Sequence, residues 1–194
     1  MKRSVVMIAP FNTRSGYGDH ARSLFYSIMD REDLDIKCLD VKWGNTPRNH
    51  LRPEVPRHKR LLDTFVSQDR IQGQPDVLID IRIPNEFATG AKVNIGITAG
   101  IETTAVSNNW IESCNKMDLI IVPSEHSKQG FVTALYEKMQ KLPNGQQQKV
   151  GELKLEKPIE VLFEGADTNI FKVTREFSQD LVDEFKDIKE DWCF

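Results

Sequence analysis

The sequence has little of what several classes of protein require. Its three cysteines, Cys38, Cys114 and Cys193, are scattered and odd in number, so they fit neither a disulfide framework nor a zinc site. No apolar run approaches the roughly 18 residues that a membrane span needs. An excess of positive charge is also lacking: 26 Lys and Arg stand against 29 Asp and Glu, which gives no sign of a nucleic-acid-binding surface. We expect a soluble, cytoplasmic, reduced protein with no membrane span and no nucleic-acid partner.

Candidate metal ligands and carboxylate pairs are sparse as well. The four histidines, at positions 20, 50, 58 and 126, show no ligand spacing. His20 and His126 are read most simply as polar residues on helix surfaces. Nothing in the sequence points to a pair of carboxylates for glycoside hydrolysis. We therefore expect neither a metal nor a cofactor.

What is present is an alternation of short apolar runs with helical patterns. Runs rich in Val and Ile, typical of strands covered on both faces, occur at 4–9, 34–41, 76–83, 92–98, 118–123 and 159–163. Helical patterns lie between them, at about 19–30, 58–68, 108–116 and 124–141. Strands that alternate with helices predict an α/β fold with a doubly wound, Rossmann-like and mostly parallel sheet.

Three segments depart from this alternation. Residues 43–60 are rich in Pro, Arg and His and indicate a long connection, whereas 142–158 are polar and Gly- and Gln-rich, typical of an exposed loop or loose hairpin. Residues 174–194 have an amphipathic helical pattern that runs into Trp192-Cys193-Phe194. Because a soluble domain seldom ends on an exposed aromatic pair, we expect the natural protein to continue.

A glycine-rich loop follows the first predicted strand. Gly16-Tyr17-Gly18-Asp19-His20-Ala21 spells G-x-G-x-x-A, a form of the dinucleotide-binding fingerprint, and Asp40 lies near the position of the expected ribose-binding acid. However, residues 10–15 separate the glycines from the strand, which is unlike that fingerprint. Glycines here can also let backbone donors approach another phosphate-bearing ligand. With no ligand, they would simply permit a tight turn, with Asp19 capping the helix.

Later motifs narrow the choice. In chain order they are Gly16-Tyr17-Gly18, Trp110, Asp118-Leu119-Ile120-Ile121-Val122-Pro123-Ser124, Phe131 and Gly165-Ala166-Asp167-Thr168-Asn169-Ile170-Phe171. This order resembles the N-terminal domain of glycosyltransferases of the B fold (GT-B), particularly the large retaining family that uses sugar nucleotides. The resemblance covers nearly all of the chain. Ala166 departs from the common Val, and Val173 stands where Pro is usual.

The resemblance implies one half of a two-domain enzyme. The full-length protein would transfer a sugar from a nucleotide-diphosphate sugar to an unknown acceptor, with retention and without a divalent metal. Residues 1–175 would form the Rossmann-like N-terminal domain, and 176–194 a linker helix leading to a C-terminal domain that this chain lacks. Gly165 and Asp167 would belong to the hinge, where Gly permits a special backbone angle. This chain alone is expected to be inactive.

The resemblance also assigns the residues on the donor side. Gly16, Tyr17 and Gly18 would face the cleft and bring backbone donors near the phosphate or the transferred sugar. Arg14 would add a charged donor, although a solvated loop arginine is an equally good interpretation.

Candidate acceptor-side residues follow two later strands, at the edge where α/β sheets bind ligands. They are Thr98, Gly100, Glu102 and Thr103 in one loop, and Asn85 and Glu86 in another. Glu102 is the candidate catalytic residue, because a carboxylate among hydroxylated residues can bind acceptor hydroxyls or assist proton removal. Its alternative role is a hydrogen bond to the loop backbone or a helix cap. Ser124 is most simply an N-cap.

Two alternatives remain open at this point. The first is an NAD(P)-dependent oxidoreductase that uses Gly16, Gly18 and Asp40. The second is a non-catalytic carbohydrate-binding or interaction module that reuses half of the transferase fold.

Overall fold

The computed structural model describes residues 2–101, 104–141, 145–168, 171–173, 176–186 and 188. The chain divides into two compact units, Met1–Glu164 and Gly165–Phe194. The predicted domain boundary after residue 175 remains a prediction.

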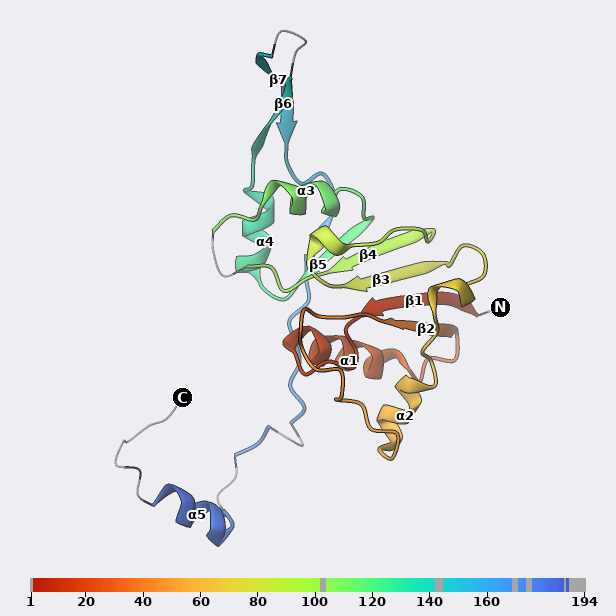
Figure 1. Ribbon diagram of the computed structural model, residues 1–194, viewed down its shortest axis with the longest axis vertical. Helices are drawn as coiled ribbons and strands as arrows, with labels where there is room; N and C mark the ends of the chain where they lie inside the picture. Colours follow the sequence, from red (N-terminus) through yellow and green to blue (C-terminus); the bar gives the residue numbers. More distant parts are fainter. Residues whose placement is uncertain are drawn as a thin grey trace. The chain divides into compact units, whose positions relative to one another are not determined.

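The first unit is built on a six-stranded parallel sheet (Figure 1). Its strands are β1 (Arg3–Ala9), β2 (Leu34–Asp40), β3 (Val77–Ile81), β4 (Val93–Ile97), β5 (Leu119–Val122) and β8 (Ile159–Val161). They lie in the order β2-β1-β3-β4-β5-β8. All six coincide with predicted strands. The signal is clearest in β1, because a parallel strand covered on both faces needs apolar residues at nearly every position.

Helices flank the sheet, as an α/β fold requires. They are α1 (Gly16–Ile28), α2 (Pro56–Leu62), α3 (Asn108–Cys114) and α4 (Glu125–Val132), with 3-10 turns η1 (Gln68–Arg70) and η2 (Pro84–Glu86). Along β1, Val5 and Met7 pack in one core cluster with Phe25 of α1, whereas Val6 and Ile8 belong to a second cluster. Side chains alternate between the faces of a strand, so both faces of β1 are buried. The fold is consistent with the predicted Rossmann-like sheet.

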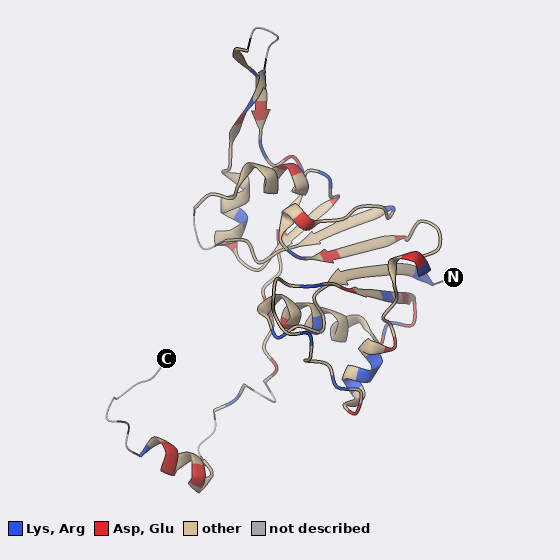
Figure 2. Cartoon of the chain, in the orientation of Figure 1, with Lys and Arg blue, Asp and Glu red and all other residues tan. Residues whose placement is uncertain are grey.

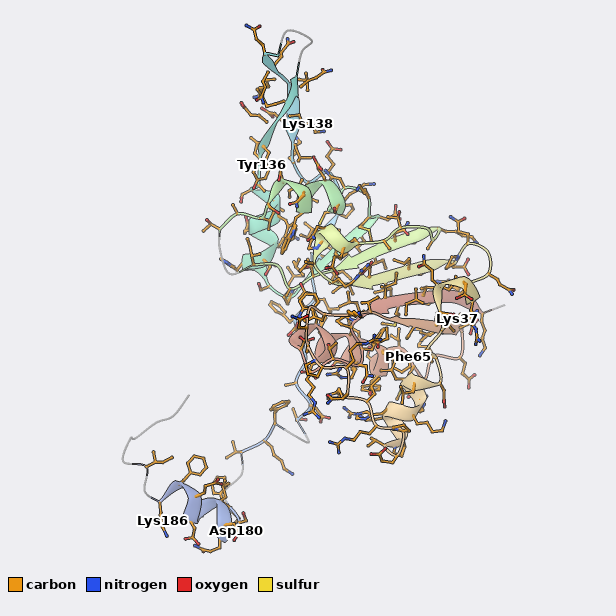
Figure 3. All side chains as sticks on the ribbon, viewed as in Figure 1. Lys37, Phe65, Tyr136, Lys138, Asp180 and Lys186 are labelled. Atoms are coloured by element: carbon orange, nitrogen blue, oxygen red, sulfur yellow. The ribbon has the colours of Figure 1, made fainter. Side chains whose placement is uncertain are left out.

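The helix predicted over 124–141 is wrong in its second half. Helix α4 ends at Val132, and the chain continues as β6 (Tyr136–Lys141), which pairs antiparallel with β7 (Gln147–Leu153). Figure 3 shows Tyr136 at the base of this hairpin and Lys138 farther along β6. The hydroxyl of Tyr136 donates to the carbonyl of Val106 and fixes the base. Segment 142–158 therefore contributes one strand of a hairpin.

The physical reason lies in the apolar spacing on which that prediction depended. Phe131 is fully buried, but Leu135 and Met139, four and eight residues later, are 58% and 48% exposed. The three side chains therefore do not share a buried face. The helix predicted over 58–68 is also wrong in its second half, because α2 ends at Leu62 and Phe65 then forms a parallel bridge with Cys38. The remaining predicted helices differ only at their ends, and α1 begins at Gly16, three residues earlier than expected.

The second unit contains α5 (Gln179–Phe185), within the segment predicted to be an amphipathic helix. Its first turn is capped by Ser178, whose hydroxyl accepts from the amide of Leu181. Gly165, the first residue of this unit, does not have a positive φ, so the special backbone angle predicted for it is absent.

The structure also bears on two expectations from the sequence, one about membrane spans and one about the cysteines. Within the described ranges, no helix is both long and apolar enough to cross a membrane. Cys38 and Cys114 are buried free thiols, and burial raises the pKa of each to about 12. Cys193 lies outside the described residues.

Candidate functional site at the carboxyl edge of the sheet

The strand order identifies one edge of the sheet as the place to look for a ligand. β2 lies on one side of β1 and β3 on the other, so the order reverses between β1 and β3. In open α/β sheets, ligands bind outside the carboxyl ends of the strands at such a reversal. The loop after β1 (residues 10–15) and the turn η2 after β3 flank this point.

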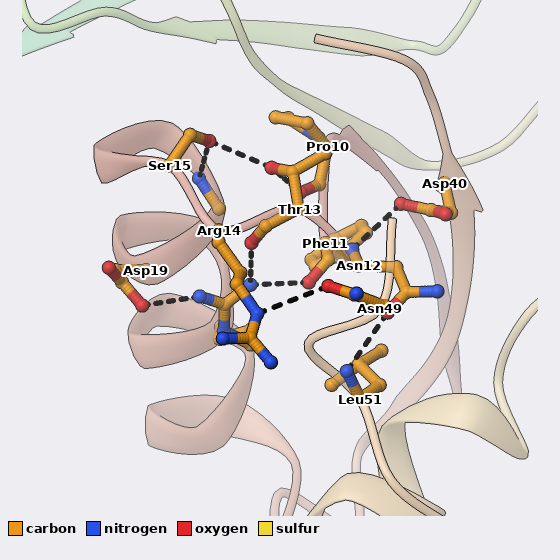
Figure 4. Close-up of polar contacts among 12 residues, drawn as sticks. Pro10, Phe11, Asn12, Thr13, Arg14, Ser15, Asp19, Asp40, Asn49 and Leu51 are labelled. Atoms are coloured by element: carbon orange, nitrogen blue, oxygen red, sulfur yellow. Dashed lines mark hydrogen bonds and ion pairs between the residues drawn. The ribbon is translucent and has the colours of Figure 1, made fainter. Parts of the chain in front are cut away.

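The loop after β1 is fixed by an arginine of the helix that follows it (Figure 4). Arg22 is almost fully buried, and its Nη1 donates to the carbonyl oxygens of Phe11 and Thr13, at 2.5 and 2.8 Å. Its Nη2 forms an ion pair with Asp19. Because charge-assisted hydrogen bonds are strong, Arg22 holds the loop against α1. Sequence reasoning did not identify this role.

Helix α1 is capped by Ser15. The alternative without a ligand predicted Asp19 as the cap, and that prediction is wrong. The Ser15 hydroxyl accepts from the amide of Gly18 at 3.1 Å. A Cβ on Gly18 would lie 2.6 Å from the carbonyl oxygen of Thr13, so this glycine is required by the packing of its own loop. Gly16 is exposed, and a Cβ there would meet nothing within 4 Å. Of the two glycines, only Gly16 borders open space.

Tyr17 joins the start of α1 to the end of β4. Its hydroxyl lies 2.9 Å from Oγ1 of Thr98 and accepts from the amide of Ala99 at 3.1 Å. Burial raises the pKa of Tyr17 above its ordinary value, more than these hydrogen bonds lower it, so the phenol is neutral near pH 7. The ring packs on the indole of Trp43, with centroids 4.4 Å apart. Trp43, in the connection after β2, was missed from the sequence.

Two carboxylates act on Tyr17 through their charge. Glu164 and Glu86 both raise the pKa of Tyr17, although burial is the larger cause. Oε1 of Glu164 lies 3.1 Å from Nδ1 of His20, whose side chain is only 16% exposed. His20 is therefore not the simple surface residue that was expected, and burial lowers its pKa despite the opposing charge of Glu164. His126 is exposed, as predicted.

Glu86 connects to a charged pair at the end of β3. Asp80 is fully buried and accepts two hydrogen bonds from Arg82, at 2.6 and 2.7 Å, and one from the amide of Ala88. Arg82 Nη1 lies 3.6 Å from Glu86. Burial alone would lower the pKa of Arg82, but its interactions with Asp80 and Glu86 outweigh burial and raise it. Asn85, predicted beside Glu86, is exposed.

The end of β4 is held by α4. Gly100 has a φ of +80°, and a Cβ there would lie 2.8 Å from both Cβ and Oγ of Ser127. The Ser127 hydroxyl donates to the carbonyl of Ala99, and Ser124 caps α4 by accepting from the amide of Ser127, which confirms the predicted cap. Thr98 thus contacts Tyr17, and the amide of Gly100 donates to Oγ1 of Thr98 at 3.5 Å. Glu102 and Thr103, the predicted catalytic and acceptor-side residues in this loop, lie outside the described residues.

Two further predicted residues lie on the other side of the β1 loop. Arg14 Nε donates to Oδ1 of Asn49 at 3.1 Å. Asp40 accepts from the amide of Asn12 through Oδ1 (Figure 4). It also accepts from Arg48 through Oδ2, so both of its carboxylate oxygens are engaged. Among the residues that the structure describes, no three His, Cys, Asp or Glu side chains are arranged to hold a metal ion.

The site therefore consists of an aromatic pair, a buried threonine hydroxyl and nearby carboxylates at the carboxyl edge of a parallel sheet. Such a set can pack against an apolar ring face and accept hydrogen bonds from hydroxyl groups. No known protein family, curated protein or solved structure matches the chain.

Proposed function

We propose that this chain is the N-terminal, acceptor-side half of a GT-B, retaining glycosyltransferase. In full-length form the enzyme transfers a sugar from a nucleotide-diphosphate sugar to an acceptor, and a C-terminal domain binds the nucleotide. The free, buried thiols and the sugar-nucleotide donor are in keeping with a cytoplasmic enzyme. The order of motifs along the chain supports the proposal, together with the site described above.

The observation that carries the proposal is the contact between Tyr17 and Trp43, together with the carboxylate charges of Glu86 and Glu164 that act on Tyr17. A sugar ring has an apolar face of C–H groups and a rim of hydroxyls. The aromatic rings offer a surface to the former, and the carboxylates offer acceptors to the latter. The Tyr17 hydroxyl is already engaged with Thr98 and Ala99, so the phenol is held in place for that contact.

Each remaining site residue has a role in this proposal. Gly16, which borders open space, lets the backbone approach the donor. Asn85 and Thr103 contribute hydrogen bonds to the acceptor, and Glu102 binds or deprotonates the attacking hydroxyl. Gly165 and Asp167 lie where the chain turns toward the C-terminal domain.

The oxidoreductase alternative is less well supported. It needs Asp40 to bind a ribose, but both oxygens of that carboxylate accept hydrogen bonds from Asn12 and Arg48. It also needs Gly18 to admit a pyrophosphate, but Thr13 and Arg22 already fill the space beside that glycine.

Saturation-transfer NMR with a panel of monosaccharides tests the binding step on this chain. We expect saturable sugar signals that Trp43→Ala abolishes. Tyr136→Phe is the matched control, because it removes a tyrosine hydroxyl with a backbone partner outside the site and should leave sugar binding unchanged. Saturable binding of NAD(H) that depends on Asp40, with no sugar binding, would overturn the proposal.

The catalytic step needs the full-length protein. There, Glu102→Gln should reduce kcat for sugar transfer, and the product should retain the anomeric configuration of the donor. If the full-length protein binds sugar but transfers none, the function is that of a carbohydrate-binding module.

A further inference from the structure

Positive charge is concentrated in the connection between β2 and β3. Residues 42–60 contain six Lys or Arg and one Glu, in a chain whose formal net charge is −3. Figure 2 shows this concentration along α2 and the segment that precedes it. Three of the six cations, Arg48, Lys59 and Arg60, form ion pairs with aspartates.

Two exposed guanidiniums in this region lack such a partner. The side chain of Arg52 contacts no carboxylate among the described residues. Arg14, from the loop after β1, has as its polar partner in the described ranges only the neutral amide oxygen of Asn49. Each guanidinium can therefore turn hydrogen-bond donors toward an anion without breaking an ion pair.

A pair of imidazoles feels the charge of these arginines, Arg14 acting on His50 and Arg52 on His58. The rings of His50 and His58 have centroids 5.4 Å apart, and the amide of Arg52 donates to Nδ1 of His58 at 3.2 Å. Because Nδ1 of His58 is an acceptor, its Nε2 is the nitrogen that carries the proton and can donate to a ligand.

The pKa shifts of the two histidines report the charge around them. Burial is the largest cause that lowers the pKa of each histidine. Arg22, His58 and Arg14 then lower that of His50, and Arg57, Arg22 and Arg52 lower that of His58. Asp19 opposes the shift at His50 and Glu54 the shift at His58, but positive neighbours outnumber them at both. An anion bound near His50 and His58 would offset the repulsion among these positive groups.

The cluster is held in shape by Asn12. Its carbonyl accepts from the amide of His50, its Oδ1 accepts from the amide of Leu51, and its Nδ2 donates to the carbonyl of Arg48. These three bonds fix the β2–α2 connection against the loop that carries Arg14. Preorganised donors lose little conformational entropy on binding a ligand.

We propose that Arg14, His50, Arg52 and His58 form a binding site for a phosphate group, either as free phosphate or as a monoester on a small molecule. A phosphate dianion has the charge to match two guanidiniums and enough acceptor oxygens to receive donors from all four side chains. The site shares Arg14 with the predicted donor-phosphate site but differs from it in its other groups, because the amides of Gly16–Gly18 take no part. It does not depend on sugar transfer.

Titration of this chain with inorganic phosphate and with glucose 6-phosphate tests the site, with the C2 protons of the histidines followed by NMR at constant ionic strength. We expect saturable shifts at His50 and His58 and none at the exposed His126. Tighter binding of glucose 6-phosphate identifies a monoester as the ligand, and equal or weaker binding identifies free phosphate.

Variants show whether the named arginines are responsible. Arg14→Ala and Arg52→Ala should each weaken phosphate binding about tenfold, as expected for the loss of a charge-assisted hydrogen bond. Arg31→Ala is the control, since Arg31 is exposed and paired with Asp33 outside the cluster. Shifts that never saturate, shifts of equal size at His126, or unchanged affinity in a folded Arg52→Ala protein would each overturn the proposal.

Discussion

Two glycines two residues apart should respond to the same substitution with opposite signs. In Gly18→Ala, the new Cβ would lie 2.6 Å from the carbonyl oxygen of Thr13, 2.8 Å from its Oγ1 and 2.9 Å from Nη1 of Arg22. Relief requires the loop to move away from α1, which strains the bonds that Arg22 makes. In Gly16→Ala, the Cβ would meet nothing within 4 Å, and the backbone there has no positive φ.

The magnitudes follow from these contacts. Overpacking costs about 1–3 kcal/mol, and the better helix propensity of alanine returns up to about 1 kcal/mol, so Gly18→Ala should lose about 1–2 kcal/mol. With about 2–4 °C per kcal/mol for a domain of this size, its Tm should fall by about 2–8 °C. Gly16→Ala should gain about 0.4–1 kcal/mol, because alanine restricts the unfolded chain.

Thermal and urea unfolding followed by far-UV circular dichroism measure both changes. The two variants are matched controls for each other, since both place one methyl group in the first turn of α1. A Gly18→Ala protein as stable as the parent, or a Gly16→Ala protein that loses as much, would refute the assignment of Gly18 to loop packing.

Three other predictions concern stability and are checked by urea unfolding. Tyr17→Phe removes a half-buried hydroxyl with two partners and should cost about 1–2 kcal/mol; an unchanged midpoint contradicts that role. Arg82→Met leaves its fully buried aspartate partner unpaired and should cost about 3 kcal/mol, against less than about 1 kcal/mol for Lys59→Met at an exposed pair; equal losses contradict this. Burial lowers the pKa of His20 and His50, so below about pH 6.5 the unfolded chain binds more protons and the midpoint should fall from pH 7.5 to 5.5; a constant midpoint contradicts this.

The fold was largely predictable from sequence because parallel strands are buried on both faces. The central strands, such as β1, are short and nearly continuous apolar runs, and that signal does not depend on distant contacts. A loose hairpin was considered for 142–158, but its first strand was not predicted, because Tyr136–Lys141 consists mostly of residues that also favour helices. Its pairing with Gln147–Leu153 decides the structure, and the Asn144-Gly145 dipeptide between them was the available turn signal.

The candidate site was predictable only in part. Tyr17 and Thr98 were each predicted as site residues because each follows a strand. The hydrogen bond between them was not predicted, because it joins residues 81 positions apart. Trp43 was missed because its connection shows no regular pattern, and its contact with Tyr17 is tertiary. Asp80 of β3 and Arg82 just after it did carry a signal, since a fully buried charge in a parallel strand demands a partner.

The guanidinium of Arg22 has a consequence for how the site comes into being. Its donors reach the carbonyls of residues 11 and 13 only when α1 is folded and packed on β1. The loop and the helix should therefore open and close as one cooperative unit, in the manner of a foldon, and not as a flexible segment attached to a rigid helix. The amide of Thr13, bonded to the carbonyl of Pro10, should then exchange its hydrogen at the rate of the helix interior. The candidate site at this edge would then be as stable as the core on which α1 packs.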